Sequence, residues 1–343
     1  MRMLLTFLLT IGLSGPTAAQ TWSDPDLGRA VVEAAADAEH LWLRGMDGVL
    51  VRIDRRTGER TLLGRGFVDM LPDGDRLWAL RGPDEYGAVI IEDLRDPSRS
   101  ATLASSDDQI GMFTSGGAWP GLVTSRQLIL HDAGDWREVP LAGELSPGVH
   151  VAADAEGRVY VGYARGEWGG GLRRIDPITG SVAFVTEASN ELCGGRLNPD
   201  CDPVVGVFPD PSRTDCIIVG TSLAHLSLKE GEIVRVCGDR ITSVFAHTVQ
   251  SDPGWPLPGQ TWPFDGLVQT ADGWVAVSQK QYARSRSGTI EMHPTPALRD
   301  WHGLRISDEQ DGILFVMSAC CWGSADVPTD HRLLTVPVMR TSR

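Results

Sequence analysis

Residues Val149–Val185 read VHVAADAEGRVYVGYARGEWGGGLRRIDPITGSVAFV. Short apolar runs alternate here with polar, glycine-rich connections, a pattern that predicts β-strands separated by tight turns. The four expected strands are Val149–Ala153, Val159–Tyr163, Leu172–Ile175 and Val182–Val185. Gly180 ends the turn before the last strand, because glycine adopts the positive φ that other residues resist. The segment therefore predicts one sheet of four short strands.

The same pattern returns elsewhere in the chain. The segment RIDRRTGERTLL, which begins at Arg52, matches RIDPITGSVAFV, which begins at Arg174. Similar units follow one another at roughly 45 residues, the length of a four-stranded propeller blade. We predict an all-β fold, a β-propeller with seven four-stranded blades; six and eight blades are the alternatives. The polar segment Thr21–Leu27 is expected to join the sheet of the last blade and close the ring.

The first 19 residues have the features of a secretory signal peptide. Arg2 precedes the apolar run Leu4–Leu13, and the small residues Thr17-Ala18-Ala19 follow it. We expect residues 1–19 to be removed and residues 20–343 to form a single propeller domain. The expected location is extracytoplasmic, in the periplasm or secreted. No apolar run is long enough to span a bilayer as a helix, so no membrane span is predicted.

The chain is acidic, with a formal net charge of -14. Sequence-independent binding to nucleic acid needs a basic surface, so the charge argues against that class of partner. The partners that remain are a small polar ligand or another protein. We expect the protein itself to be a monomer.

Six cysteines are compatible with an oxidising compartment. They are Cys193, Cys201, Cys216, Cys237, Cys320 and Cys321. The sequence alone does not select their connectivity. We predict Cys193–Cys201, which closes a short loop, and Cys216–Cys237, which joins neighbouring strands of one blade. A bond between the two remaining cysteines would be strained, because adjacent Cα atoms lie closer than a relaxed disulfide requires.

Five polar residues fall at or near one repeat position, where the innermost strand of each blade begins. They are Asp69, His150, Asp202, Asp265 and His302. Inner strands of a propeller converge on its axis, so we expect these side chains on one funnel-shaped face. Loops between second and third strands reach the same face and contribute Glu167, Trp168, Lys280 and Trp322. A concave place with convergent polar groups is a typical ligand site.

The residue types suggest three roles. The candidate ligand-binding residues are Asp69, Asp202, Asp265, Trp168, Lys280 and Trp322. The candidate ligands of one divalent metal ion, Ca²⁺ or a transition metal, are Asp202, Asp265 and His302. The candidate acid–base residues are Glu167, His150 and His302. The structural alternative is that the aspartates cap backbone N–H groups and the histidines hydrogen-bond a neighbouring blade.

The repeated RIDRRTG and RIDPITG turns, the blade length, and the openings Asp75-Arg76-Leu77-Trp78 and Asp272-Gly273-Trp274-Val275 carry a resemblance. The chain resembles the secreted seven-bladed propellers that include gluconolactonase-like, streptogramin-lyase-like and NHL-repeat proteins. The resemblance covers most of the mature chain, and it is architectural. It implies the fold and not a function, because propellers include hydrolases, lyases, quinoprotein dehydrogenases and binding platforms.

Three functions follow as hypotheses. The favoured one is an extracytoplasmic propeller that binds a small polar ligand or a protein partner at its central funnel. The alternative is a metal-dependent hydrolase or lyase with Asp and His ligands on the axis. A further alternative is a quinone-dependent oxidoreductase, because propeller quinoproteins can carry a disulfide between adjacent cysteines, as Cys320-Cys321 would. The chain contains no nucleophile elbow, phosphate loop or dinucleotide fingerprint. The sequence leaves open whether the protein is an enzyme.

Overall fold

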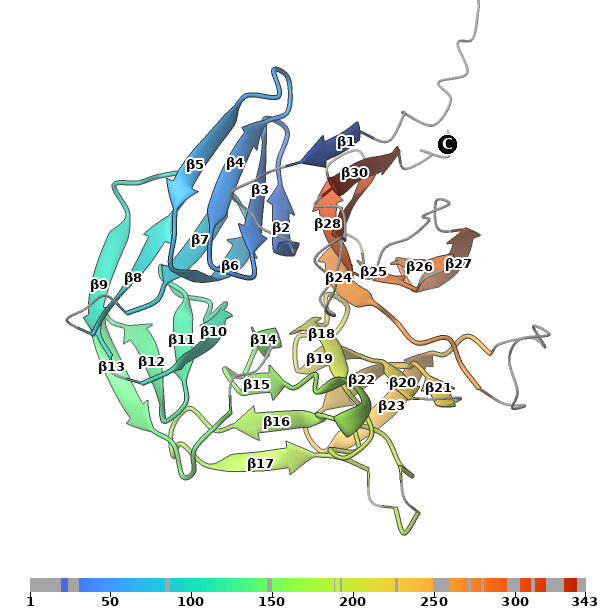
Figure 1. Cartoon of the computed structure of the whole chain (residues 1–343). Helices are drawn as coiled ribbons and strands as arrows, with labels where there is room; N and C mark the ends of the chain where they lie inside the picture. The colour runs from blue at the N-terminus through green and yellow to red at the C-terminus, as the bar shows by residue number, and fades with distance from the viewer. Residues whose placement is uncertain are drawn as a thin grey trace, which may run out of the picture.

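The chain forms a ring of four-stranded antiparallel sheets around a central axis (Figure 1). The structure is a computed structural model. It describes residues 20–23, 31–83, 87–105, 107–146, 150–187, 189–191, 193–225, 228–248, 260–270, 273–278, 281–294, 303–309, 312–318 and 330–337. The predicted all-β propeller with four-stranded blades is confirmed.

Six of the four-stranded sheets are each built from one continuous segment of the chain. The first three, from inner to outer strand, are β2 (Val31–Ala36), β3 (His40–Gly45), β4 (Leu50–Asp54) and β5 (Arg60–Gly64); β6 (Phe67–Asp73), β7 (Arg76–Arg81), β8 (Ala88–Asp93) and β9 (Ser100–Ala104); β10 (Gln109–Phe113), β11 (Gly121–Thr124), β12 (Gln127–Asp132) and β13 (Asp135–Pro140). The next three are β14 (His150–Ala153), β15 (Val159–Gly162), β16 (Leu172–Ile175) and β17 (Val182–Val185); β18 (Val204–Pro209), β19 (Cys216–Thr221), β22 (Ile233–Cys237) and β23 (Arg240–Phe245); β24 (Gly266–Thr270), β25 (Gly273–Val277), β26 (Gln281–Arg286) and β27 (Thr289–Pro294). We number these blades one to six in chain order. The hairpin of β20 (Leu223–His225) and β21 (Leu228–Glu230) is inserted into blade five.

The remaining four-stranded sheet joins the two ends of the described chain. It contains β28 (Gly303–Glu309), β29 (Gly312–Ser318) and β30 (Asp330–Pro337), with β1 (Gln20–Ser23) as its outermost strand. β1 runs antiparallel to β30, with Gln20 opposite Leu333 and Ser23 opposite Asp330. The ring is therefore closed by an N-terminal strand, which confirms the expectation that the segment around Thr21 joins the last sheet (Figure 1).

The strands expected in blade four are confirmed. β16 and β17 have the expected bounds, and β14 and β15 differ from the expected ranges by one residue at one end. The repeated RID turn has the same mechanism in blades one and four. Asp54 Oδ1 accepts hydrogen bonds from the N–H groups two and three residues later, at 2.9 and 2.7 Å, and Asp176 does so at 2.8 and 2.9 Å. Gly58 and Gly180 follow at φ +73° and +70°, so both turns need glycine.

The core lies between the faces of neighbouring sheets. The second strand of a blade is buried on both faces: every residue of β11, β15, β19 and β25 is buried. In β7, Trp78 is fully buried and packs with Met112, Leu122 and Ile129 of blade three. These apolar contacts between blades hold the ring together, because burying apolar surface is the main favourable term in folding.

Within the residues that the structure describes, no helix has the length and apolar character needed to cross a membrane. The signal-peptide prediction for Met1–Ala19 falls outside these residues, as do Cys320 and Cys321. Three of the predicted site residues, Lys280, His302 and Trp322, also lie outside them.

Candidate functional site

The aligned polar residues do not share one position in their blades. Asp69 is the third residue of β6, and His150 is the first residue of β14. Asp265 directly precedes β24, and Asp202 lies two residues before β18. The four described members of the set are therefore spread along the inner strands instead of forming one ring.

β-bulges in the inner strands account for part of this spread. The register shifts after the first residue of β2, β6, β10 and β18. The residues after the shift are Glu33, Asp69, Gly111 and Gly206, and these are the structural equivalents of one another. A bulge adds one residue to a strand without a separate sequence signature, so alignment of apolar runs alone does not detect it.

The predicted site residues have different surroundings. The carboxylate of Asp69 accepts a hydrogen bond from the Met112 N–H of the next blade, at 2.6 Å, which matches the structural alternative for this residue. Asp265 is exposed, and its N–H donates to the Val277 carbonyl at 2.7 Å. His150 is partly buried and lies opposite Gly162 in the sheet. Glu167 and Trp168 belong to the 3-10 turn Gly166–Trp168, in which Trp168 is 73% exposed.

The glycine run after this turn packs against another segment of the protein. The Gly170 N–H donates to the Pro199 carbonyl and the Gly171 N–H donates to the Asp202 carbonyl, both at 2.8 Å. A Cβ on Gly170 would lie 1.8 Å from the carbonyl oxygen of Tyr163, so no larger residue fits there. The run therefore fastens the segment that carries Asp202 to blade four.

A disulfide-bonded loop leads from β17 to β18. The predicted Cys193–Cys201 bond is present, with the two Cα atoms 5.2 Å apart. Asn198 lies inside the closed loop: its N–H donates to Asp202 Oδ2 at 2.8 Å, and its side-chain amide donates to the Gly194 carbonyl at 3.1 Å. The cross-link and these hydrogen bonds hold the Asp202 carboxylate in one place.

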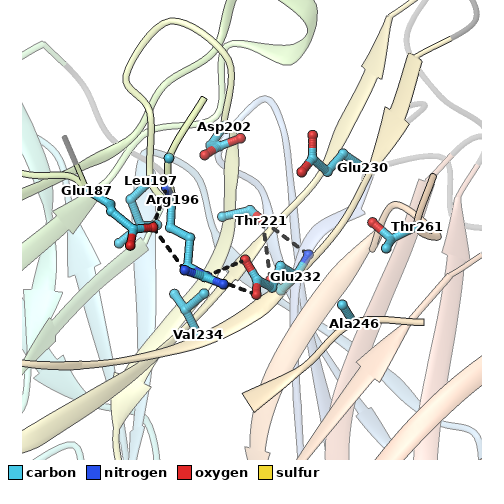
Figure 2. Close-up of a pocket in the computed structure, with 11 residues that line it drawn as sticks. Glu187, Arg196, Leu197, Asp202, Thr221, Glu230, Glu232, Val234, Ala246 and Thr261 are labelled. Carbon is cyan, nitrogen blue, oxygen red and sulfur yellow. Dashed lines mark hydrogen bonds and ion pairs between the residues drawn. The ribbon is translucent and has the colours of Figure 1, made fainter. Parts of the chain in front are cut away.

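Asp202 lines a cavity of about 330 Å³ (Figure 2). We call it the Asp202 cavity. It opens where β19 and β23 end and β18, β22 and β24 begin, so it lies on the face where we expected the site, although among the loops of blade five. The lining residues are Glu187, Gly195, Arg196, Leu197, Asp202, Thr221, Glu230, Glu232, Val234, Ala246 and Thr261.

One wall of the Asp202 cavity is an ion-pair network. Arg196 Nε lies 3.1 Å from both carboxylate oxygens of Glu232, and its Nη1 lies 2.9 Å from Glu187 Oε2. The Thr221 hydroxyl oxygen accepts a hydrogen bond from the Glu232 N–H at 3.2 Å. The positive charge of Arg196 is therefore already paired with the carboxylates of Glu187 and Glu232.

The opposite side of the cavity carries carboxylates without a cation among the described residues. Figure 2 shows Asp202 and Glu230 facing the same opening above Thr221. Asp202 is only 9% exposed. Its pKa is raised from 3.8 to about 6: burial is the main cause, the nearby Glu230 and Glu232 contribute to the rise, and N–H groups of Asn198 and Leu197 oppose it. Burial and the neighbouring Glu232 also raise the pKa of Glu230.

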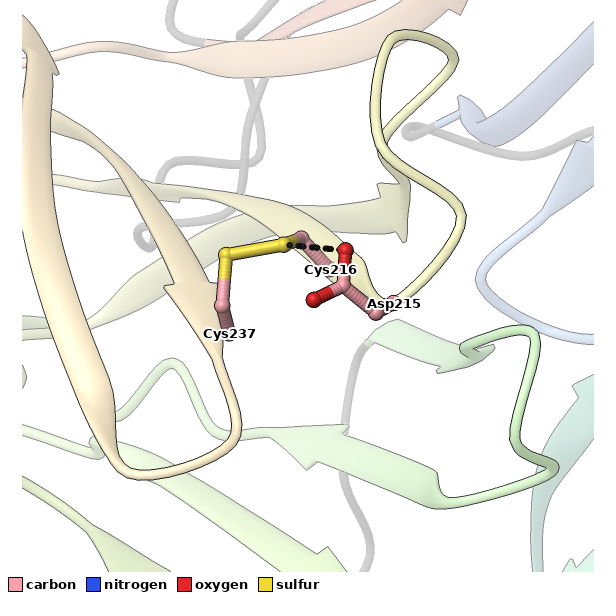
Figure 3. A group of neighbouring side chains, drawn as sticks. All are labelled: Asp215, Cys216 and Cys237. Carbon is pink, nitrogen blue, oxygen red and sulfur yellow. Dashed lines mark hydrogen bonds between the residues drawn. A yellow bond between two sulfur atoms is a disulfide. The ribbon is translucent and has the colours of Figure 1, made fainter.

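The described residues offer one candidate group of metal ligands. Within the described ranges, one group of three potential ligand atoms lies within 4.8 Å: Asp215, Cys216 and Cys237 (Figure 3). These cysteines form the second predicted disulfide, with Cα atoms 4.4 Å apart, so they offer no thiolate. Asp202 and Asp265 belong to no such group among the described residues. A metal site made of these two aspartates with His302 remains a prediction.

The comparisons with known proteins show the fold. No family model matches the chain, and no curated protein matches it in sequence. Streptogramin B lyase is similar in structure, with 11% identity and a TM-score of 0.56 over 93% of this chain and 97% of that one. The WD40 domain of Neurospora crassa Pan2 has 11% identity and a TM-score of 0.56 over 93% and 95%.

A third similar structure is the extracellular domain of a putative hybrid two-component system from B. thetaiotaomicron. It has 12% identity and a TM-score of 0.52, and the match covers 94% of this chain and 40% of that one. At these identities the likeness identifies the chain as a β-propeller and transfers no activity.

Several cavity residues were not anticipated from the sequence, namely Glu187, Arg196, Thr221, Glu230 and Glu232. They come from the loop before β18, the end of β19 and the segment before β22, which the fold of blade five brings together. One feature of the sequence could have indicated this site: the interval between β17 and β18 is long for a blade connection, and it contains a predicted disulfide. A long, cross-linked connection on the loop face is a reasonable place to look for a site.

Proposed function

We propose that this protein is an extracytoplasmic binding propeller whose ligand is a small organic cation, an amine or a guanidinium, held in the Asp202 cavity. The observation that supports this most strongly is the buried Asp202 carboxylate, which faces the cavity beside further carboxylates. The proposal specifies a positive charge for the polar ligand expected on the funnel face, and it specifies the cavity that binds this ligand.

The charge balance of the lining favours a cation. Four carboxylates, from Glu187, Asp202, Glu230 and Glu232, line the cavity with one arginine, and this arginine is engaged by two of them. Burial and the charge of neighbouring glutamates raise the pKa of both Asp202 and Glu230. A bound cation would offset that repulsion and stabilise both ionised forms.

The size and the remaining lining suit an organic ligand. A volume of about 330 Å³ lies at the lower end of the range for ligand pockets, roughly 300–1,000 Å³, so it suits a small molecule. Val234, Leu197 and Ala246 add apolar surface, and the Thr221 hydroxyl adds a hydrogen-bonding group. An amine with a short carbon chain could place its charge near Asp202 and its chain on the apolar wall.

The extracytoplasmic location is part of the proposal. Two disulfides, Cys193–Cys201 and Cys216–Cys237, cross-link the described structure. Disulfides of this structural kind persist in oxidising compartments. Expression of the full chain with a C-terminal reporter, followed by cell fractionation, tests this part; the reporter in the cytoplasm would contradict it.

Calorimetry tests the ligand class. The first probe is agmatine, which carries an amine and a guanidinium, and the matched probe is 4-guanidinobutyrate, which replaces the amine by a carboxylate. We expect agmatine to bind more tightly, because the carboxylate of the second probe would be repelled. Equal binding of the two probes, or binding of neither, would contradict the proposed ligand class.

Two variants test whether agmatine binds in the Asp202 cavity. Asp202→Asn keeps the shape of the side chain and removes its charge, and we expect agmatine affinity to fall by about 10- to 100-fold, the worth of a hydrogen bond to a charged group. Asp200→Asn is the matched control, because Asp200 is exposed in the same loop and does not line the cavity. Equal loss in both variants would indicate a general charge effect and not this site.

A further inference from the structure

The disulfide-bonded loop before blade five forms one wall of the Asp202 cavity. Residues 195–197 line the cavity, and so does Asp202. The Cys193–Cys201 disulfide encloses residues 195–197 and ends one residue before Asp202. We call residues 193–202 the site loop. All of the lining that the site loop contributes is therefore inside the disulfide-bonded ring or directly attached to it.

The backbone of the site loop has a conformation that its own side chains disfavour. Leu197 has φ +56° and Cys193 has φ +61°, both in the left-handed region. They are two of the four non-glycine residues with positive φ in the part of the chain that the structure describes. A residue with a bulky side chain keeps this conformation only where its surroundings impose it. The cavity wall therefore needs a restraint to keep its shape.

Hydrogen bonds around Asn198 supply part of this restraint. Its side-chain amide donates to the Gly194 carbonyl at 3.1 Å, and its N–H donates to Asp202 Oδ2 at 2.8 Å. Its carbonyl oxygen accepts the Asp202 N–H at 2.8 Å. These bonds connect Asn198 to the two ends of the site loop, so they are kept only while both ends stay in place. The covalent link between the ends is the disulfide.

Contacts with the blades would keep the site loop attached to the ring without the disulfide. Leu197 is 1% exposed and packs in the apolar core between blades four and five. The carbonyl groups of Pro199 and Asp202 accept hydrogen bonds from the glycine run of blade four. Opening the disulfide is therefore expected to loosen the cavity wall and to leave the blades in place.

The second disulfide has no such relation to the cavity. Cys216 and Cys237 are directly opposite each other in β19 and β22, and four further residue pairs continue the ladder between these strands (Figure 3). Neither cysteine is among the lining residues of the cavity. The sheet keeps the two strands paired when this bond is opened, so Cys216–Cys237 is a matched control for Cys193–Cys201.

We propose that the Cys193–Cys201 disulfide controls the affinity of the Asp202 cavity for its ligand. With the bond formed, the site loop holds Arg196 and Asp202 in place; with the bond opened by a dithiol, the cavity wall loosens and the affinity falls. This inference rests on the proposed function of the cavity. In the opening reaction the dithiol gives two electrons and two protons, the S–S bond breaks, both cysteines become thiols, and the dithiol becomes a cyclic disulfide.

Calorimetry with agmatine compares two double variants with the wild type in the absence of reductant. We expect Cys193→Ser with Cys201→Ser to lower the affinity by about tenfold or more, because a loosened site must be ordered when the ligand binds. Cys216→Ser with Cys237→Ser is the control, and its affinity is expected to match that of the wild type. Unchanged affinity in the first variant, or an equal loss in both, would overturn the inference.

Reduction of the folded control variant gives a second readout, which does not depend on how the first variant folds. Dithiothreitol opens the bond, and thiol alkylation with peptide mass spectrometry measures the reduced fraction of Cys193 and Cys201. We expect the loss of agmatine affinity to follow this fraction, and the affinity to return after reoxidation. Constant affinity while both cysteines become reduced would overturn the inference.

Amide hydrogen exchange separates the inference from the proposed function, because it needs no ligand. We expect faster exchange at the N–H groups of Asn198 and Asp202 when the Cys193–Cys201 bond is open, and unchanged exchange in β22. Unchanged exchange in the site loop would overturn the inference even where the wild type binds agmatine. Absence of agmatine binding to the oxidised wild type would instead overturn the proposed function, and the inference with it.

Discussion

Replacing Asp202 by asparagine should change how the stability of the protein depends on pH. Asp202 is 9% exposed, and its pKa is raised from 3.8 to about 6, mainly by burial. Between these two pH values the native state holds a proton that the unfolded chain has released. The wild type therefore loses stability from this group as the pH rises through that window.

The magnitude follows from the size of the pKa change. Each pKa unit corresponds to about 1.4 kcal/mol, so ionisation of Asp202 in the folded protein costs about 3 kcal/mol. Asp202→Asn has no such cost, and its amide oxygen can still accept the Asn198 N–H. The difference in unfolding free energy between variant and wild type should grow by about 3 kcal/mol, in favour of the variant, from about pH 4 to pH 7.

Urea denaturation followed by tryptophan fluorescence at several pH values measures this difference. A comparison across pH is preferable to one pH value, because it cancels any constant effect of the substitution on packing. Asp200→Asn provides the baseline, since this exposed neighbour should leave the pH dependence unchanged. A difference between Asp202→Asn and wild type that stays constant from pH 4 to pH 7 would refute the reasoning.

Three more predictions concern the framework around the site. Gly170→Ala should destabilise the protein by more than about 2 kcal/mol in thermal or chemical denaturation, because its Cβ would lie 1.8 Å from the carbonyl oxygen of Tyr163 at φ +155°; unchanged stability would show that this loop is not as closely packed as described. The double variant Cys216→Ser with Cys237→Ser should lose about 3 kcal/mol, the expected effect of opening a disulfide of this loop length, and reduction of the wild type, which also opens Cys193–Cys201, should cost more than the double variant does. Asp176→Ala should lower the melting temperature, because it removes two hydrogen bonds to turn N–H groups; Asp176→Asn, which keeps the acceptor, should lower it less.

Local chemistry made much of the fold predictable. The RID turns combine an aspartate that accepts two backbone N–H groups with a glycine at positive φ, and both requirements are visible in the sequence. The apolar runs of blade four match the observed strands because turn residues bound each strand and because β15, at the centre of the blade, is buried along its whole length. The ring closure by β1 was also predictable, since a propeller needs one sheet that joins its ends.

The candidate site was harder to predict from the sequence than the fold. Asp69 was aligned with Asp202 because both precede or begin apolar runs, but Asp69 follows a bulge in β6 and accepts a hydrogen bond from the Met112 N–H of blade three. Asp202, predicted from the sequence as a ligand-binding and metal-binding residue, lines the Asp202 cavity, and its binding role stays a prediction. Its neighbours Glu230 and Glu232 were not predicted from the sequence. Their distance from Asp202 depends on how blade five packs beside the disulfide-bonded loop, and no local sequence pattern indicates that packing.

The carboxyl groups of Glu33 and Asp69 differ from those of the Asp202 cavity in their partners within the protein. Glu33 of β2 accepts a hydrogen bond from Arg44, and Asp69 of β6 accepts one from the Met112 N–H, so groups of the protein engage both. In the Asp202 cavity, the arginine belongs to Glu187 and Glu232, while Asp202 and Glu230 face open volume. This contrast is why we assign a structural role to the first group and a binding role to the second.

The most direct test of the binding role is the pH dependence of agmatine affinity, measured by calorimetry between pH 5 and pH 8. We predict that the affinity of the wild type falls below about pH 6, as Asp202 takes up a proton and loses the charge that holds the ligand, and that Asp202→Asn binds weakly at every pH. Agmatine binding that is equally strong in Asp202→Asn, with the same pH profile, would contradict the account.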